Sequence, residues 1–555
     1  MSANRQDIVE YSVTQGNAVL QRRSRQRLKE KGQFITPAPV ARYMARKIGP
    51  IRNNDRVLDP AVGSGTLVSA LIERIVEDSE CVEIWVDGYE IDPEMCRVAR
   101  DVLAVATSYA AAQGVIVHSH VYEADYITGH WISHQQHSLW EEDTSSPQGR
   151  YTHVVANPPY FKLNRNDERV KIVAGRVSGD TNIYTLFMAL ALEQMSPFGE
   201  ACFIVPRSFC SGVYFSQFRK DLIKKALPLS FHLFDSRDAT FKDGAVLQEN
   251  VILAFKRRGQ DESQPKDEQS IEVSASVDGS GLPHLIHGRR VATRYVLLNR
   301  RGRVFFRLPT CELDEQIIDT MDGWSDSIET YGLRVSTGPV VAFRSRSLLS
   351  DAESVRHGTA VPLLWLRNVK PGEVIWPLDN GKLQAISVDA DKDKLLVPAT
   401  NHVLVRRFSA KEEERRLVAA AFISGNWEHP RIGLENHLNF IYRPGGELTT
   451  DEAYGLAAFL DSALADRYFR ILNGNTQVNA EELRSLPLPR SDVIEAIGKE
   501  VATARASQTQ PDTDELVFSI LRDQGCLHAD FPTIKETRIT MGKIQEARGV
   551  AASGW

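Results

Sequence analysis

Residues 157 to 160 read Asn-Pro-Pro-Tyr and directly follow the apolar run at 153–156. Two prolines and an aromatic residue after a buried strand predict a fixed polar pocket at the edge of a sheet. There, the side-chain carbonyl of Asn157 and the main-chain carbonyl of Pro158 could accept the two hydrogens of a planar amino group. Such a group is a poor nucleophile because its nitrogen lone pair is delocalised, and two fixed acceptors favour the geometry that frees it. Tyr160 offers a flat surface on which a base could stack.

The surrounding pattern indicates how such a pocket would be positioned. A strand that ends in a proline-rich turn would give the same four letters, so the motif needs its structural context. From about residue 33 to 257 the chain alternates between helical and strand patterns, which is typical of a doubly wound α/β domain. The expected helices lie at 38–48, 65–78, 93–112, 181–196 and 214–226. The expected strands lie at 56–59, 83–89, 115–121, 152–156, 200–206, and near 230–235 and 246–256.

The first strand-to-helix turn contains two glycines, Gly63 and Gly65, where a ligand can approach the backbone closely. The turn begins at Asp59, which ends the expected strand. A dinucleotide fingerprint needs a third glycine at the position of Val68. The turn therefore favours a nucleoside without a pyrophosphate.

Acidic residues end the next two expected strands. Glu90 could accept hydrogen bonds from both hydroxyls of a ribose, and Asp125 could reach the amino group of an adenine. Each carboxylate could equally cap a helix, and Asp92 is expected to be such a cap. Upstream, Thr36 and Pro37 are also typical of a plain helix start. The order of the carboxylates on successive strands favours a nucleoside site.

Several segments occur in the order of a known enzyme class. GQFITPAPVARYMA, VLDPAVGSGTLV, GYEIDP, YEADYI and VVANPPYF together resemble the γ class of amino-group DNA methyltransferases over about residues 30–257. Four others are similar to the BsuBI/PstI-type (Eco57I-like) adenine methyltransferases of restriction-modification systems: PRSFCSGVYFSQFRKDLI, FDSRDATFKDGAVLQENVILAFKR, TGPVVAFR and NTQVNAEELRSLPLP.

This resemblance implies a Rossmann-like domain with a mostly parallel seven-stranded sheet and S-adenosyl-L-methionine as methyl donor. It implies double-stranded DNA as substrate, with transfer to the N6 amino group of a flipped adenine. It assigns the target adenine to Asn157, Pro158, Pro159 and Tyr160, with Phe161 as a second aromatic contact to the DNA. It assigns the methionine moiety to Thr36 and Pro37, the length of the cofactor to Asp59, Gly63 and Gly65, its ribose to Glu90 with the adjacent Ile91, and its adenine to Asp125.

Other functions stay open from the sequence. Methyltransferases for RNA or protein glutamine can also use an Asn-Pro-Pro-Tyr pocket, and a DNA-binding module could have lost catalysis. The long segment after residue 257 argues against the first alternative, and the complete set of motif residues argues against the second. A cytosine-C5 methyltransferase is excluded, because it needs a Pro-Cys nucleophile and the chain has no such pair.

Composition narrows the class of protein. A net charge of −6 argues against a uniformly basic surface but leaves room for local basic patches. Six cysteines without a C-x-x-C pair fit reduced thiols, and no cluster of metal ligands is apparent. The start lacks a signal peptide and no run of 18 apolar residues occurs, so we expect neither secretion nor a membrane span. The resemblance to restriction-modification enzymes implies a prokaryotic cytoplasmic protein on the nucleoid. A cognate restriction endonuclease would be a separate protein.

We expect five parts along the chain. They are an N-terminal helical arm (1–32), the catalytic domain (33–257), a linker (258–274), a mixed, mainly β target-recognition domain (275–490) and a helical extension (491–555). The arm ends in a basic cluster that is either a solvated helix face or a phosphate contact.

An arginine-rich stretch without acidic residues opens the expected recognition domain, between Asp278 and Glu312. Arginines at this density suit phosphate contact and guanine recognition, although an amphipathic hairpin would expose arginines as well. The DNA contacts expected here are Arg289, Arg290, Arg294, Arg300, Arg301 and Arg303.

Overall fold

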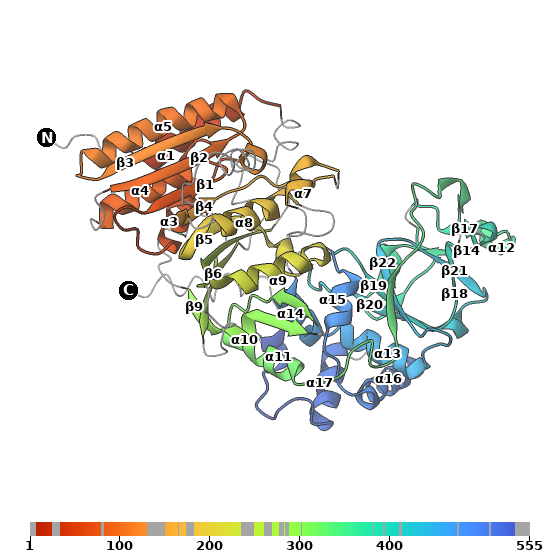
Figure 1. Ribbon diagram of the computed structural model, residues 1–555. Coiled ribbons are helices and arrows are strands. Elements are labelled where there is room, and N and C mark those ends of the chain that lie inside the picture. Colours follow the sequence, from red (N-terminus) through yellow and green to blue (C-terminus); the bar gives the residue numbers. More distant parts are fainter. Residues whose placement is uncertain are drawn as a thin grey trace. The chain divides into compact units, whose positions relative to one another are not determined.

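The computed structural model divides into two compact units, Met1–Thr310 and Cys311–Trp555 (Figure 1). Both units contain residues that the structure does not describe. The residues that the structure describes are 7–24, 34–78, 83–129, 150–164, 166–173, 182–234, 249–259, 269–276, 282, 288–300, 302–379, 381–391, 394–409, 413–473, 477–509 and 512–538.

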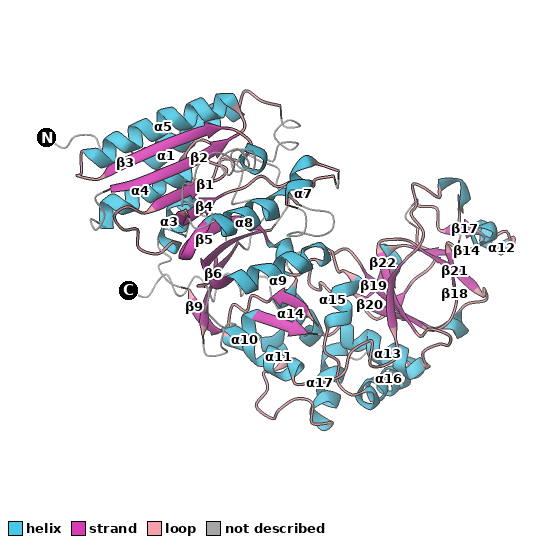
Figure 2. Ribbon diagram, viewed as in Figure 1, coloured by secondary structure: helices cyan, strands magenta, loops and turns pink. Residues whose placement is uncertain are grey.

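A nine-stranded sheet forms the centre of the first unit, in the order β3-β2-β1-β4-β5-β7-β6-β8-β9 (Figure 2). Parallel pairs join β1 to β2 and β4, β2 to β3, β4 to β5, and β6 to β8. Antiparallel pairs join β7 to β5 and β6, and β9 to β8. The strands are β1 (Arg56–Asp59), β2 (Glu83–Glu90), β3 (Ile116–Glu123), β4 (Tyr151–Ala156), β5 (Met195–Pro206), β6 (Ala226–Phe234), β7 (Asn250–Arg257), β8 (Ser270–Ser276) and β9 (Arg289–Ala292).

This topology determines where a ligand can bind. The chain runs outward from β1 through β2 to β3, then returns to place β4 on the other side of β1. Ligands of open α/β sheets bind at such a reversal of strand order, beyond the carboxyl ends of the strands. The expected segments at 56–59, 83–89, 115–121 and 152–156 are confirmed as the four strands around this point.

Helices cover the sheet of the first unit. Among them, α5 begins at Pro93 because Asp92 accepts hydrogen bonds from the main-chain nitrogens of Glu94 and Met95, which confirms the expected cap. None of the described helices is long and apolar enough to cross a bilayer. The helices are α1 (Ile8–Leu20), α3 (Ala38–Lys47), α4 (Thr66–Asp78), α5 (Pro93–Ala111), α7 (Glu168–Ile172), α8 (Ile183–Gln194), α9 (Ser216–Lys225) and α10 (Thr293–Val296).

The N-terminal helix α1 is part of the first unit rather than a separate arm. It packs against α4 and α5, and a Cβ added at Gly16 would lie only 2.6 Å from the hydroxyl of Ser64 in the glycine turn. Arg23, from the basic cluster after α1, forms an ion pair of 2.8 Å with the buried Asp92. This arginine therefore has a structural role, while residues 25–33 lie outside the described ranges.

The second unit is a mixture of short strands and helices. Its strands form a four-stranded sheet (β12-β22-β19-β20), a five-stranded sheet (β13-β17-β14-β21-β18) and the pair β15-β16. They are β12 (Arg334–Thr337), β13 (Leu349–Ser350), β14 (Ala360–Leu364), β15 (Val369–Lys370), β16 (Glu373–Val374), β17 (Ala385–Ser387), β18 (Leu396–Pro398), β19 (His402–Arg406), β20 (Ala419–Phe422), β21 (Arg431–Leu434) and β22 (Leu438–Tyr442). The helices are α11 (Glu312–Asp322), α12 (Glu353–Arg356), α13 (Thr450–Leu460), α14 (Ala463–Leu472), α15 (Ala480–Ser485), α16 (Ser491–Ala506), α17 (Thr513–Asp523) and α18 (Ile534–Thr537).

The boundaries between the parts differ from those expected. Residues 270–276, placed in the linker and at the start of a recognition domain, form β8 and pair with β6 of the large sheet. The hairpin β10 (Leu297–Arg300) and β11 (Arg303–Phe306) also belongs to the first unit, which ends at Thr310. The C-terminal helical region begins with α13 at Thr450 rather than at 491, and the later helices pack on it: α16 and α17 contact α13, and α18 contacts α14.

We expect Asp514→Ala to destabilise the second unit by about 3 kcal/mol, as for other broken buried ion pairs. The buried Asp514 side chain accepts hydrogen bonds from Ala463 N at 2.7 Å, Arg415 at 2.6 Å and Arg538 at 2.6 Å. Its removal leaves these donors without their acceptor. Denaturation in guanidinium chloride measures the change, and Asp523→Ala on the exposed side of α17 should leave the midpoint unaltered.

Candidate active site

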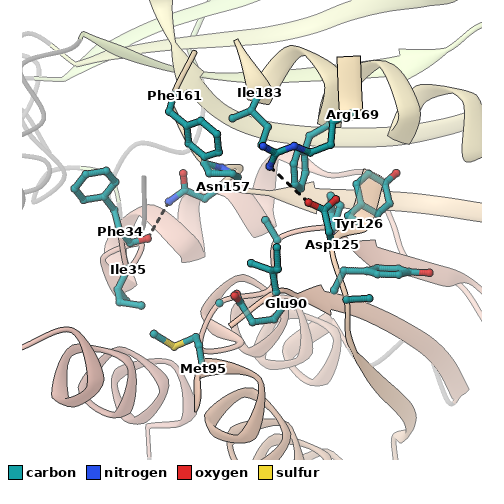
Figure 3. A pocket seen from close by; sticks show the side chains of 18 of the residues that line it. Phe34, Ile35, Glu90, Met95, Asp125, Tyr126, Asn157, Phe161, Arg169 and Ile183 are labelled. Atoms are coloured by element: carbon teal, nitrogen blue, oxygen red, sulfur yellow. Dashed lines mark hydrogen bonds and ion pairs between the residues drawn. The ribbon is translucent and has the colours of Figure 1, made fainter. Parts of the chain in front are cut away.

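A cavity of about 250 Å³ lies at the point where the strand order reverses (Figure 3). It is formed where β1, β2 and β4 end and where the chain continues into its loops and helices. The lining residues are Leu20, Phe34, Ile35, Pro60, Ala61, Gly63, Tyr89, Glu90, Ile91, Met95, Ala124, Asp125, Tyr126, Asn157, Pro159, Phe161, Arg169, Ile183 and Phe187.

The glycine turn forms one wall of the cavity. Gly63 has a φ of +54°, in the left-handed region, and an added Cβ would meet nothing closer than 3.9 Å. Gly65, at a φ of +81°, does not line the cavity, and a Cβ added there would lie 3.3 Å from the side chain of Leu103 in α5. The two glycines thus have different roles: Gly63 lets a ligand approach the backbone, and Gly65 lets α5 pack closely.

Asp59 precedes this turn and is buried. Its Oδ1 accepts a hydrogen bond from Ala61 N at 3.1 Å, while Oδ2 has no partner among the described residues. Burial, with a smaller contribution from the nearby charge of Glu90, raises the pKa of this carboxyl to about 8. A buried acceptor without a donor is an incomplete arrangement that a bound ligand or water would complete.

Glu90 lies at the carboxyl end of β2 and lines the cavity next to the half-exposed Ile91. Its Oε1 accepts a hydrogen bond from Asp92 N at 2.9 Å. Burial is the main cause that raises the pKa of Glu90 to about 7, because the charged form is poorly solvated there. In its charged form, Glu90 is a strong acceptor for a hydroxyl donor in the cavity, because hydrogen bonds to a charged acceptor are stronger than neutral ones.

Asp125 follows β3 and has two roles. Its Oδ1 caps a helical turn by accepting from Ile127 N at 2.8 Å and Thr128 N at 3.1 Å. Its Oδ2 lies 3.6 Å from Nη1 of Arg169, which reaches over the cavity from α7 (Figure 3). The guanidinium of Arg169 also lies 5.7 Å from the ring of Phe161. Arg169 therefore connects the Asp125 side of the cavity with the aromatic residue beside the proline turn.

Asn157 is held by three groups from two segments. Its Nδ2 donates to Thr36 Oγ1 at 3.0 Å and to the main-chain oxygen of Phe34 at 3.5 Å. Its Oδ1 accepts from the Tyr160 hydroxyl at 2.6 Å. An amide oxygen has two lone pairs, so Oδ1 keeps one for a further donor. The amide is thereby fixed with an acceptor available for an amino group in the cavity.

The remaining motif residues take separate positions. Thr36 is buried and accepts from Asn157, and Pro37 precedes α3 without a capping side chain, so the plain helix start was the wrong interpretation of Thr36. Pro159 and Phe161 line the cavity, while Pro158 and Tyr160 do not. Tyr160 was expected to offer a stacking surface, yet its hydroxyl, which has one hydrogen to donate, lies 2.6 Å from Asn157 Oδ1 and 2.7 Å from the Ile204 oxygen.

We expect Tyr160→Phe to lower the rate of the chemical step by about threefold to tenfold, the effect of one lost hydrogen bond. The phenyl ring would remain for stacking, but Asn157 would lose the donor that orients Oδ1. Burial raises the pKa of Tyr160 well above its ordinary value, so the hydroxyl keeps its proton and donates. Single-turnover rates measure the effect, with Tyr109→Phe on α5 as control; an unaltered rate would mean that the hydroxyl does not position Asn157.

The expected arginine contacts lie away from this cavity. Arg289 and Arg290 are in β9, Arg294 is in α10 with its guanidinium 4.5 Å from the Tyr295 ring, and Arg300 and Arg303 face each other in the β10-β11 hairpin. Arg290 and Arg294 are exposed, and Arg301 lies outside the described residues. All belong to the first unit.

Sequence reasoning missed part of the cavity wall. Leu20, Met95, Arg169, Ile183 and Phe187 line the cavity, but they lie in helices or helix ends whose apolar spacing is also that of an ordinary core. For Arg169, its position shortly after the Asn-Pro-Pro-Tyr motif could have marked it as a candidate for the cavity wall. Nothing in the sequence alone relates it to Asp125.

Comparisons with known proteins agree on one family. The family model described as N-6 DNA Methylase matches residues 17–229. The type II methyltransferase M.BsuBI of Bacillus subtilis is 33% identical over 500 residues, which cover 89% of this chain and 95% of that protein. The type II methyltransferase M.PstI of Providencia stuartii is 30% identical over 482 residues, with 87% and 91% covered. In fold, the chain is similar to the type IIL restriction-modification enzyme MmeI in complex with DNA, at a TM-score of 0.52 and 12% identity, covering 91% of this chain and 74% of that one.

Proposed function

The chain belongs to the N-6 DNA methylase family, among the type II methyltransferases similar to M.BsuBI and M.PstI, and we propose on this premise that it methylates adenine N6 in double-stranded DNA. It would act at a specific short site, as the modification enzyme of a restriction-modification system. The observation that carries the proposal is the orientation of Asn157, whose Oδ1 has a free lone pair at the cavity wall.

We propose that the cavity binds S-adenosyl-L-methionine. This cofactor is a nucleoside with a sulfonium group, and when bound it supplies the methyl group. The open space at Gly63 and the carboxylates Glu90 and Asp125, which line the cavity, suit a cationic ligand with hydroxyl and amino donors. We assign the ribose to Glu90 and the adenine to Asp125, with Ile91 as an apolar neighbour.

The chain's own residues would position the target and exclude water. An amino group inside a duplex is hidden, so the adenine must leave the stack, at a cost of a few kcal/mol. Asn157 Oδ1 at the cavity wall and the main-chain carbonyl of the adjacent Pro158 would accept the two hydrogens of N6. Phe161, which lines the cavity, would contact the ring together with its neighbour Tyr160. Positioning and fixed acceptor dipoles supply the catalysis, because the methylated nitrogen can lose its proton to solvent afterwards.

DNA is favoured over RNA and protein glutamine as the acceptor. The curated relatives match along both units of the chain, and their names describe them as type II methyltransferases. We propose that the second unit, with the strands between Arg334 and Tyr442, selects the DNA sequence. The exposed Arg290 and Arg294 of the first unit would contact phosphates.

A modification enzyme of this kind implies a partner endonuclease and a place of action in the cell. A modification enzyme protects DNA from a cognate endonuclease, which we expect to be a separate protein. Its substrate would be chromosomal DNA, so the enzyme would act in the cytoplasm of a prokaryotic cell.

Two measurements test the proposed function. Purified protein with labelled S-adenosyl-L-methionine should transfer the label to unmethylated duplex DNA, and not to RNA or to protein. Modification mapping of genomic DNA from cells that express the chain should find N6-methyladenine at one short sequence. Label in RNA or protein alone, or methylated cytosine in the DNA, would contradict the proposal.

A further inference from the structure

A loop of the second unit presents an aromatic side chain to solvent. Phe343 is 78% exposed, the largest exposure among the large apolar residues of the described chain, and the Arg344 guanidinium lies 5.3 Å from its ring. Arg346 is exposed nearby. A single exposed apolar residue is ordinary. Phe343 needs further evidence of a function, and the hydrogen bonds that fix its loop provide it.

The loop is built on a rigid base. Gly338 N donates to Leu438 O at 2.9 Å and Val340 N donates to Leu434 O at 3.0 Å. A Cβ at Gly338 would clash with the main-chain oxygen of Glu435, so only glycine allows this approach. The chain then turns, with the main-chain nitrogens of Arg344 and the buried Ser345 donating to Val341 O. Phe343 is therefore held outward by an ordered turn.

A second basic turn follows β14, which pairs with β21. This turn, η5 (Leu366–Asn368), exposes Arg367. It is fixed by the fully buried Asn368, whose side chain accepts from Trp365 N at 2.7 Å and donates to Ile375 O at 2.6 Å. Lys382 lies 4.4 Å from the ring of Trp365.

The two turns are connected through the residues after β21. Glu435 N donates to Leu364 O at 3.0 Å, and Asn436 N donates to Val340 O at 2.9 Å, so the three segments are neighbours. A cavity of about 160 Å³ opens between Trp365, Leu366, Arg367, Lys382, Glu435 and His437. His437 is held by the buried Glu435 at 2.7 Å. We name Phe343, Arg344, Arg346 and Arg367 the basic-aromatic surface.

We infer that this basic-aromatic surface binds the DNA duplex, with Phe343 inserted between neighbouring base pairs. The inference rests on the proposed function. Arg344 and Arg346 contact the phosphates on either side, and Arg367 reaches a base edge. Apolar wedges flanked by arginines unstack base steps in this way, and cationic side chains beside them attract the phosphates.

Phe343→Ala tests the wedge in the full-length protein. The probe is a set of short duplexes that carry the mapped methylation site, each with 2-aminopurine at a different position of the site. We expect DNA affinity to fall by roughly tenfold to a hundredfold, as for lost aromatic–base stacking, together with the fluorescence rise that reports unstacking. Phe343→Leu should restore part of both, because leucine also serves as an apolar wedge. Cofactor affinity should not change.

Arg344→Gln combined with Arg346→Gln tests the phosphate contacts independently. The slope of log affinity against log salt concentration should decrease by about two, one phosphate for each arginine. Phe198→Ala is the matched control for Phe343→Ala, because Phe198 is also an exposed phenylalanine beside a cation: it is 52% exposed and lies next to Lys256 near the amino end of β5. It should bind and methylate DNA like the wild type.

The outcomes separate this inference from the proposed function. If wild-type protein transfers no methyl group to any duplex, the proposed function fails. If wild-type protein methylates its site and the Phe343 and Arg344/Arg346 variants bind and unstack DNA equally well, the basic-aromatic surface is overturned while the proposed function stands.

Discussion

Asn157→Ala is expected to lower the rate of methyl transfer from bound cofactor to bound DNA by about 10²- to 10³-fold, the usual effect of removing one preorganised polar group. The variant loses Oδ1, the side-chain acceptor that Asn157 contributes to the cavity wall and that we propose for the target amino group. It should still bind both substrates, because Glu90, Asp125 and the aromatic residues of the cavity are unaltered. Single-turnover kinetics with saturating cofactor and duplex DNA measure the rate.

The design distinguishes a chemical from a structural effect. Asn157→Asp keeps an acceptor but loses the donor to Thr36 and Phe34, so its rate should lie between those of wild type and Asn157→Ala. Asn166→Ala removes an exposed amide from the same loop and should be silent. Thermal unfolding of all three should resemble the wild type. A normal transfer rate in Asn157→Ala would refute the assigned role of this residue.

Most of the first unit was predictable because its strands and turns depend on local sequence. The buried strand β4, the two glycines after β1 and the acidic residues that end β2 and follow β3 were all identified from periodicity and turn residues. Parallel strands end at one edge of the sheet, so these residues had to meet. The expected site around Glu90, Asp125 and Asn157 follows from that geometry, and the structure brings these three residues to one cavity.

What sequence patterns missed depends on contacts between distant segments. The hydroxyl of Thr36 had an adequate local explanation as a helix start, while its hydrogen bond to Asn157 spans 121 positions. The docking of α1 depends on the space left by Gly16 against Ser64, which no periodicity reports. Likewise, β8 and β9 extend the edge of the large sheet, but their short polar strands resemble a linker and the start of a new domain.

Glu90→Gln is expected to weaken binding of S-adenosyl-L-methionine by about tenfold to a hundredfold at pH 8, since hydrogen bonds to a charged acceptor contribute about 1.5–3 kcal/mol. A glutamine carbonyl accepts more weakly, and its amino group cannot accept from the second hydroxyl. The same change should stabilise the free protein at pH 8. Because burial raises the pKa of Glu90 to about 7, its contribution to stability is present below pH 4.5 and lost as the pH rises through 7.

Calorimetry and thermal unfolding between pH 4.5 and 8 test both parts. In wild type, cofactor affinity should fall as the pH decreases below 7, because a protonated Glu90 loses acceptor capacity; Glu90→Gln should lack this contribution. The melting temperature of the variant should exceed that of wild type at pH 8 and approach it at pH 4.5, where both side chains are neutral. Glu123→Gln, at the exposed end of neighbouring β3, should alter neither quantity. Equal affinity of wild type and Glu90→Gln at pH 8 would remove Glu90 from the ribose site, whereas equal stability would mean that its carboxylate is better solvated than its burial indicates.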